Sequence, residues 1–107
     1  MTDHGTTPGI TVEVKVNDSA EASIHIAGDL GFTTVPAAYE KTRQCFAEHR
    51  RITVDLEKVG RSDSAALALV LEWQRLAKEA GAELILQNIP PMLHNIARVS
   101  ELDEQLL

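Results

Sequence analysis

Two serines and an aspartate, Ser62, Asp63 and Ser64, stand directly before an apolar segment over residues 65–71. The helical spacing of the apolar residues from Ala66 onward predicts that Asp63 caps a helix beginning at Ser64. There the Ser64 hydroxyl would lie beside unpaired backbone N–H groups at the positive end of the helix dipole. A phosphate on Ser64 would be stabilised locally and would add about −1.5 to −2 charges. Simple helix capping accounts for the same residues, and the sequence leaves both interpretations open.

A third interpretation makes Ser62 or Ser64 the nucleophile of a small hydrolase. That mechanism requires a histidine base within hydrogen-bond reach of the serine. In the predicted topology no histidine lies near Ser64. The four histidines of the chain are His4, His25, His49 and His94. We therefore expect no catalytic residue and a protein that is not an enzyme.

Metal and cofactor sites are not indicated either. The histidines never stand at metal-ligand spacing, and the single cysteine, Cys45, has no second thiol beside it. Glycine-rich phosphate loops of the P-loop or dinucleotide-binding type are absent from the sequence. We expect neither a metal nor a cofactor.

The composition is typical of one soluble domain. The chain has 107 residues, of which 44% are hydrophobic and 24% charged. Its net charge of −6 opposes binding to nucleic acid. The longest apolar run is well below the ~20 residues that a membrane helix needs. With one cysteine and no secretory signal, the sequence predicts a cytoplasmic protein without direct membrane insertion.

Hydrophobic periodicity predicts strands that alternate with helices. The polar residues 1–10 are expected to form a flexible leader. Strands are predicted over residues 12–16, 24–26, 52–56 and 84–86, the last as an apolar run typical of a strand covered on both faces. Loops are expected at 28–32 and up to Gly60. Helices are predicted from about 34 to 49, from 63 to 80 with Gly81 as the C-cap, and from 90 to 97.

The resulting order, β-β-α-β-α-β-α, predicts an α/β fold. Strands that alternate with helices are expected to run parallel and to be joined by right-handed crossovers. We expect a mixed four-stranded sheet that opens with a β-hairpin and has three or four helices packed against it. One domain would span residues 11–107.

Several segments resemble the STAS domain family, which includes the anti-sigma-factor antagonists. Val54-Asp55-Leu56 followed by Asp63-Ser64-Ala65-Ala66-Leu67 is similar to the family signature, and Gly28-Asp29-Leu30 precedes the first helix as it does in the family. Within the family, MlaB-type proteins are the most similar, through residues 28–36, 66–73, 88–91 and 96–100. The resemblance extends from about Thr11 to the C-terminus and implies a STAS fold.

The resemblance to MlaB-type proteins implies a non-enzymatic subunit of the Mla phospholipid-transport ABC complex, which maintains outer-membrane lipid asymmetry. In that family the STAS protein binds the ATPase subunit and supports its assembly and activity, on the cytoplasmic side of the inner membrane. The residue that matches Ser64 lies at the contact surface. We expect an adaptor whose partner-binding residues are Asp29, Leu30, Phe32, Arg61, Ser62, Asp63 and Ser64.

The resemblance to anti-sigma-factor antagonists implies an alternative function. In those proteins a partner kinase phosphorylates the serine that matches Ser64, and release of a sigma factor depends on its state. This chain has Ala66 where the family commonly has glycine, and Gly31 where antagonists tend to carry a second acid. Both differences weaken the kinase-regulated interpretation and leave a docking role intact.

Phe32 is an aromatic residue in an otherwise polar loop, and it has two interpretations. As an exposed side chain it would be an anchor for a partner protein. Folded back, it would instead cover the core as a lid, which needs no partner.

Overall fold

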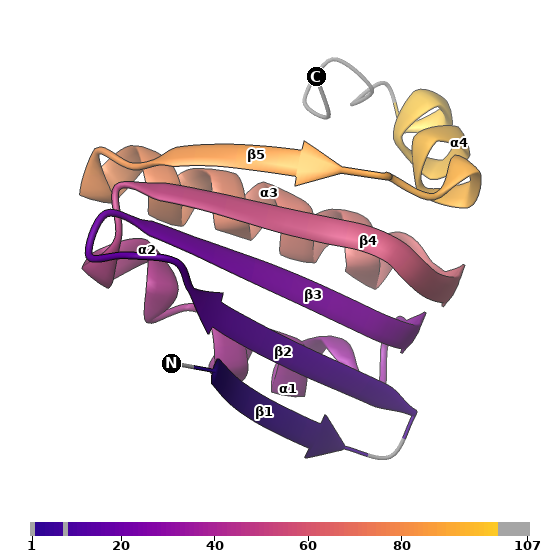
Figure 1. Cartoon of the computed structure of the whole chain (residues 1–107). Helices are drawn as coiled ribbons and strands as arrows, with labels where there is room; N and C mark the ends of the chain where they lie inside the picture. Colours follow the sequence, from indigo (N-terminus) through magenta and orange to yellow (C-terminus); the bar gives the residue numbers. More distant parts are fainter. Residues whose placement is uncertain (1, 8, 101–107) are drawn as a thin grey trace.

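The structure, a computed structural model, describes residues 2–7 and 9–100 of the chain. Its elements in chain order are β1 (Thr2–Thr7), β2 (Ile10–Val16), β3 (Glu21–Leu30), α1 (Val35–Thr42), α2 (Cys45–Glu48), β4 (Arg51–Ser62), α3 (Ser64–Ala80), β5 (Glu83–Gln87) and α4 (Pro91–Val99). The strands form one sheet in the order β1-β2-β3-β4-β5 (Figure 1). Because β2 and β3 pair antiparallel while β3, β4 and β5 run parallel, the predicted α/β fold with a mixed sheet is confirmed.

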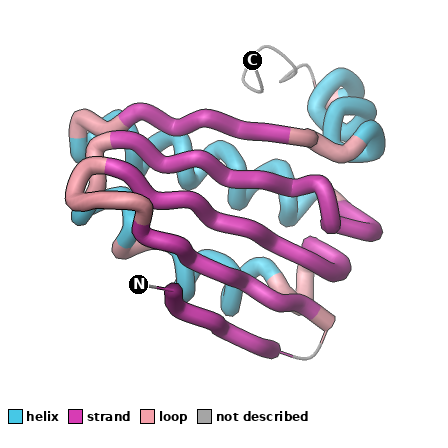
Figure 2. Tube along the Cα trace, viewed as in Figure 1, coloured by secondary structure: helices cyan, strands magenta, loops and turns pink. Residues whose placement is uncertain are grey.

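Helices cover one face of the sheet and leave the other face open. In Figure 2 the strands, in magenta, lie in front of α1, α2 and α3, in cyan. Every second residue is buried under these helices from Ala22 to Ile26 in β3 and from Ile52 to Leu56 in β4, whereas His25 between two buried neighbours is exposed. Trp73 of α3 is fully buried in the resulting core. The period-2 pattern in the sequence therefore identified the buried face correctly.

The strand at 84–86 is not covered on both faces, contrary to expectation. Leu84, Ile85 and Leu86 of β5 are all only half-buried. Leu84 and Leu86 pack against the core, whereas Ile85 between them points to the opposite face. A continuous apolar run was therefore compatible with an edge strand that has helices on one face alone.

The chain begins with a strand where a flexible leader was expected. Residues Thr2–Thr7 form β1 and pair antiparallel with β2, with Thr2 opposite Lys15 and Thr7 opposite Ile10. β-Branched threonines favour extended backbone, and the pairing satisfies backbone groups that β2 would otherwise expose at an edge. The sheet therefore has a fifth strand in addition to the four expected.

The first predicted helix is divided in two. α1 ends at Thr42, and α2 is a separate short turn that begins at Cys45. The buried Thr42 hydroxyl donates to the Ala38 carbonyl (2.7 Å) and accepts from Trp73 Nε1 (2.9 Å). A hydroxyl that bonds back to the preceding turn tends to bend a helix, and the predicted helix is divided just after Thr42. The apolar stripe continues across the break, because Cys45 and Phe46 of α2 are buried.

The central strands are longer than the sequence indicated, and this positions the loops that follow them. β3 continues to Leu30 and β4 to Ser62, with register shifts between His25 and Ala27 and again between Gly28 and Leu30. Beyond the shifts the parallel pairing resumes, and Leu30 lies opposite Ser62. Since β3 and β4 end side by side, the β3–α1 loop and the start of α3 are brought together.

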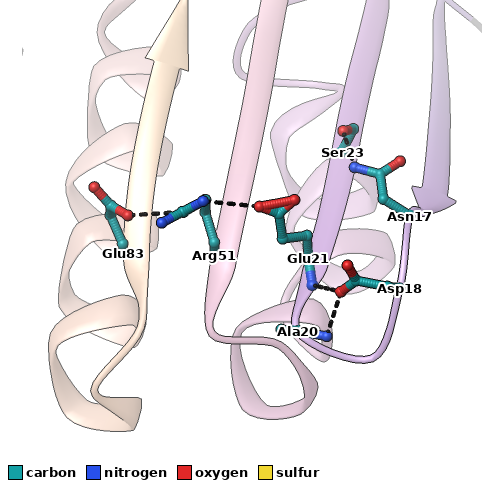
Figure 3. Close-up of polar contacts among 7 residues, drawn as sticks. All are labelled: Asn17, Asp18, Ala20, Glu21, Ser23, Arg51 and Glu83. Atoms are coloured by element: carbon teal, nitrogen blue, oxygen red, sulfur yellow. Dashed lines mark hydrogen bonds and ion pairs between the residues drawn. The ribbon is translucent and has the colours of Figure 1, made fainter.

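The opposite end of the sheet is held by a row of charged side chains. Arg51 lies between Glu21 and Glu83 and donates to both, at 2.8 and 3.0 Å, so that it links the starts of β3, β4 and β5 (Figure 3). The Asp18 carboxylate accepts from the backbone N–H groups of Ala20 (2.7 Å) and Glu21 (2.9 Å) in the β2–β3 turn. Exposed ion pairs of this kind contribute little stability, so Arg51 offers a mild control site far from the loops after β3 and β4.

Among the described residues, no helix has the length and apolar character needed to cross a bilayer.

Candidate functional site

The exposed residues at the carboxyl ends of β3 and β4 form a single surface, here called the loop face. It consists of Asp29 near the end of β3 and Phe32 in the loop that follows, with Arg61 near the end of β4, Asp63 after it and Ser64 at the start of α3. These residues are about thirty positions apart in sequence and meet because β3 and β4 pair up to their ends. Five of the seven residues predicted from the sequence thus lie exposed in one place.

The start of α3 has the geometry that the sequence predicted. Asp63 is extended, and its Oδ1 accepts a hydrogen bond from the Ala65 N–H (2.8 Å), which makes it the N-cap. Ser64 is the first residue of the helix and is exposed. Gly81 ends the helix with a φ of 69°, in the left-handed conformation that glycine favours. Ser64 is therefore available to another protein at the positive end of a seventeen-residue helix.

Two carboxylates connect the loops to one another. The Phe32 N–H donates to Asp63 Oδ2 (3.1 Å), and the Arg61 N–H donates to Asp29 Oδ1 (2.9 Å). The segment around the end of β3 and the segment around the end of β4 thus each supply a carboxylate that binds the backbone of the other. We call Asp29, Asp63 and these two bonds the cross-loop clamp.

Two glycines make room for the clamp. A Cβ at Gly31 would lie 2.7 Å from Asp63 Oδ2, and a Cβ at Gly60 would lie 2.7 Å from Asp29 Oδ1. Within the first loop, the Thr34 hydroxyl accepts from the Gly31 N–H (2.9 Å) and donates to the Asp29 carbonyl (2.8 Å). The carboxylates therefore reach the backbone only because these two positions have no side chain.

Exposed apolar side chains flank a hollow on the loop face. Phe32 is 82% exposed, which contradicts its interpretation as a lid on the core, and Met92 of α4 is 50% exposed. The hollow has a volume of about 410 Å³, and its lining residues are Asp29, Gly31, Phe32, Thr33, Thr34, Arg61, Ser62, Asp63 and Met92. Sequence reasoning missed Met92, although its position beside the buried Leu93 placed an apolar residue off the core stripe of that helix.

Leu30 and Ser62 do not belong to the exposed surface, contrary to expectation. Leu30 is fully buried and Ser62 is 7% exposed. They are opposite each other in the β3–β4 register, and each is buried at the end of its strand. The Ser62 hydroxyl is buried and has no hydrogen-bond partner among the described residues. These two residues therefore shape the loop face from beneath.

The described residues do not assemble a catalytic or metal-binding group at the loop face. Ser64 has no hydrogen bond to a histidine; His49 Nδ1 instead lies 3.3 Å from the Ser19 carbonyl, at the end of the sheet where β4 begins. No cluster of three or more metal-ligating side chains occurs in the part of the chain described. Arg61 makes no ion pair with any described residue, so its charge faces outward. The loop face thus offers the apolar ring of Phe32, the cation of Arg61, the hydroxyl of Ser64 and the carboxylates of Asp29 and Asp63.

A second hollow, of about 250 Å³, lies on the open face of the sheet around His25 and Asp55. Asn88 Nδ2 donates to Asp55 Oδ1 (3.0 Å), and the Glu57 N–H donates to the same oxygen (2.9 Å). These hydrogen bonds lower the pKa of Asp55 below its usual value. Asp55 Oδ2 also lies 3.7 Å from His25 Nδ1. These contacts tie β3, β4 and the end of β5 together away from the loop face.

Comparisons with known proteins agree with this architecture. The family model described as "Mlab, STAS domain" matches residues 15–107. The anti-sigma factor antagonist SpoIIAA in its unphosphorylated form is similar in structure, with a TM-score of 0.71 and 20% identity over 87% of this chain and 83% of that one. SpoIIAA of Bacillus in its phosphorylated form has a TM-score of 0.69 and 20% identity, over 87% and 86% of the two chains.

An anti-sigma factor antagonist from Mycobacterium paratuberculosis is also similar, with a TM-score of 0.71 and 20% identity over 94% of this chain and 86% of that one. At this level of identity the similarity establishes the fold and nothing finer. No curated protein sequence matches the chain.

Proposed function

The chain belongs to the STAS domain family, and we propose that it is a non-enzymatic adaptor which binds the ATPase subunit of an ABC transporter for phospholipid trafficking. The observation that carries this proposal is the exposure of Phe32 in a loop held beside Ser64. A large aromatic side chain that is fixed and exposed is typical of a residue that anchors a protein interface. The loop face is the surface that we assign to the ATPase subunit.

The composition of the loop face supports a protein as the partner. Phe32 and Met92 offer apolar contacts in the lining of a hollow, and Arg61 in the same lining offers a cation. Apolar and aromatic anchors surrounded by polar groups are characteristic of protein interfaces. Catalysis plays no part in this role, because binding alone transmits the effect to the ATPase.

The choice of partner rests on the family and on two residues. The matching family model carries the description Mlab. Gly31 stands where antagonists tend to have an acid, and Ala66 where the family commonly has glycine. Both differences weaken recognition by a kinase and leave constitutive docking intact. We propose that the adaptor works in the cytoplasm and stays at the inner membrane through its partner, as one subunit of the system that maintains outer-membrane lipid asymmetry.

One alternative is an anti-sigma-factor antagonist that is regulated by phosphorylation of Ser64. Two observations favour it: Ser64 is exposed at the start of α3, and similar structures include an antagonist solved in phosphorylated and unphosphorylated forms. Its partner would be an anti-sigma kinase. Complete phosphorylation of Ser64 by such a kinase from the host, together with no binding to the ATPase subunit, would favour this alternative.

The adaptor function is tested by measuring the affinity of the purified chain for the purified ATPase subunit of the host's Mla-type complex. Ser64→Trp should weaken binding at least about tenfold, because a bulky side chain would separate the two surfaces at their centre. Arg51→Ala, at the other end of the sheet, should bind as the wild type does. Equal affinity of Ser64→Trp and wild type would remove Ser64 from the interface.

A further inference from the structure

We propose that Asp29 and Asp63 are positioning residues of the loop face. The cross-loop clamp holds Phe32 and the start of α3 in the one arrangement that the partner recognises, while the two carboxylates themselves face the backbone of this chain. This inference rests on the proposed adaptor function. According to this proposal, the clamp raises the affinity for the ATPase subunit by fixing the loop face before binding. Helix capping by Asp63 would not have this effect, and the two carboxylates need not contact the partner.

The two oxygens of Asp63 have separate partners. Oδ1 accepts from the Ala65 N–H, which is all that an N-cap requires. Oδ2 accepts from the Phe32 N–H, thirty-one positions away in sequence. The second bond does nothing for α3 and instead fixes the loop that carries the exposed aromatic ring.

Phe32 depends on its backbone for its position. Because its side chain is 82% exposed, packing against the core does little to hold it. The other bonds of the loop, such as Val35 N–H to the Gly31 carbonyl (2.8 Å), close a turn within the same segment. Among the described bonds, the bond to Asp63 links the Phe32 backbone to α3. A loop fixed before binding loses less conformational entropy when the partner docks.

The glycines at 31 and 60 are independent evidence for the clamp. Each clamp carboxylate lies 2.7 Å from the place where a Cβ would be at one of these positions. Neither Gly31 nor Gly60 has a positive φ, so the close approach of a carboxylate, and not backbone strain, is what excludes a side chain there. A methyl group added at Gly31 is therefore expected to displace the Asp63 carboxylate and so to break its hydrogen bond with the Phe32 N–H.

The test uses Asp63→Asn and Gly31→Ala, singly and together. Asparagine keeps an oxygen that accepts from the Ala65 N–H, but its amide group cannot accept from Phe32. Gly31→Ala displaces the Asp63 oxygen and leaves residue 63 unchanged. Asp18→Asn is the matched control, since Asp18 also accepts from two backbone N–H groups, at the far end of the sheet.

The first measurement is amide hydrogen exchange in the free protein, which requires no partner. Each variant should raise the exchange rate of the Phe32 N–H about tenfold or more, the change expected when one hydrogen bond to a charged group is lost. The Ala66 N–H, which donates to the Asp63 carbonyl within α3, should exchange as in the wild type. An unchanged rate at Phe32 in both variants would overturn the clamp.

The second measurement is affinity for the purified ATPase subunit. Each single variant should weaken binding about tenfold, and the double variant should be no weaker than either, because both remove the same bond. Asp18→Asn should bind as the wild type does. Faster exchange at Phe32 with unchanged affinity would refute the positioning role while Ser64→Trp still tests the adaptor function. If the wild type itself does not bind, the adaptor function and the positioning role both fail, and the exchange data alone then describe the free protein.

Discussion

Replacing Phe32 by alanine separates binding from stability more cleanly than any other change on the loop face. The side chain is 82% exposed in the free protein, so almost all of its apolar surface remains to be buried by a partner. It also makes few contacts that the fold depends on. Phe32→Ala should therefore weaken docking and leave the free energy of unfolding near the wild-type value.

The expected loss of affinity follows from the exposed area. Complete burial of a phenylalanine side chain is worth roughly 1.5–3 kcal/mol. Since about four fifths of this surface is still exposed and alanine retains one carbon, the loss on docking should be roughly 1–2 kcal/mol. That range corresponds to an affinity about 5- to 30-fold weaker. The free energy of unfolding should change by no more than about 0.5 kcal/mol, as is usual for an exposed site.

The assay is titration calorimetry with the purified ATPase subunit, together with urea unfolding of each variant. Val99→Ala is the matched control, because Val99 is an apolar residue that is 83% exposed and does not line the hollow. It should leave the affinity unchanged. Wild-type affinity of Phe32→Ala would refute the assignment of Phe32 as an anchor. A large loss of stability would show instead that the ring supports the fold.

Three further changes test contacts elsewhere in the fold. Thr42→Val should lower the free energy of unfolding by about 1–3 kcal/mol in urea, because the buried Trp73 N–H loses its acceptor. Ser62→Ala should be neutral or slightly stabilising in the same measurement, because the buried hydroxyl has no partner among the described residues to lose. The pKa of Asp55 is lowered, first by its hydrogen bond from Asn88. Its carboxylate therefore stabilises the fold at pH values above the unfolded-state pKa. This stabilisation is lost as the pH falls through the lower folded-state pKa. Asp55→Ala should therefore be less stable than the wild type at pH 7, and unfolding across a pH series should show the difference narrowing below about pH 4.

Local signals in the sequence were sufficient to predict the start and end of α3. Asp63 caps the helix, Ser64 begins it and Gly81 ends it, each through contacts within a few residues. Helix caps depend on residues close in sequence, so they can be predicted without knowledge of the rest of the fold. The strand alternation around Ile24 and Val54 likewise identified the buried face of the sheet.

Features that depend on pairing between distant segments were not predicted. The polar residues Thr2–Thr7 carry no hydrophobic alternation, and they become a strand because the edge of β2 is available to pair with. Leu30 and Ser62 were expected on the surface because glycines before them indicated loops. Pairing between β3 and β4 instead extends both strands past Gly28 and Gly60, and after two register shifts it places both residues in buried positions.

The cross-loop clamp could not have been predicted from the sequence either. Asp29 and Asp63 were identified as candidates for contact with a partner, whereas their carboxylates bind backbone N–H groups of this chain. Only the register of β3 against β4 brings these residues together. Met92 was missed for the same reason, since its place beside the hollow depends on how α4 packs after β5.

The most direct test of the central claim is an NMR map of the chain's backbone amides on titration with the purified ATPase subunit. The account predicts that the largest shift changes and line broadening occur at the loop face, around Asp29, Phe32, Arg61 and Ser64, and at Met92. Amides of the open face of the sheet, such as those of Lys15 and His25, should be unaffected. A footprint centred on the open face, with the loop face unchanged, would contradict the account.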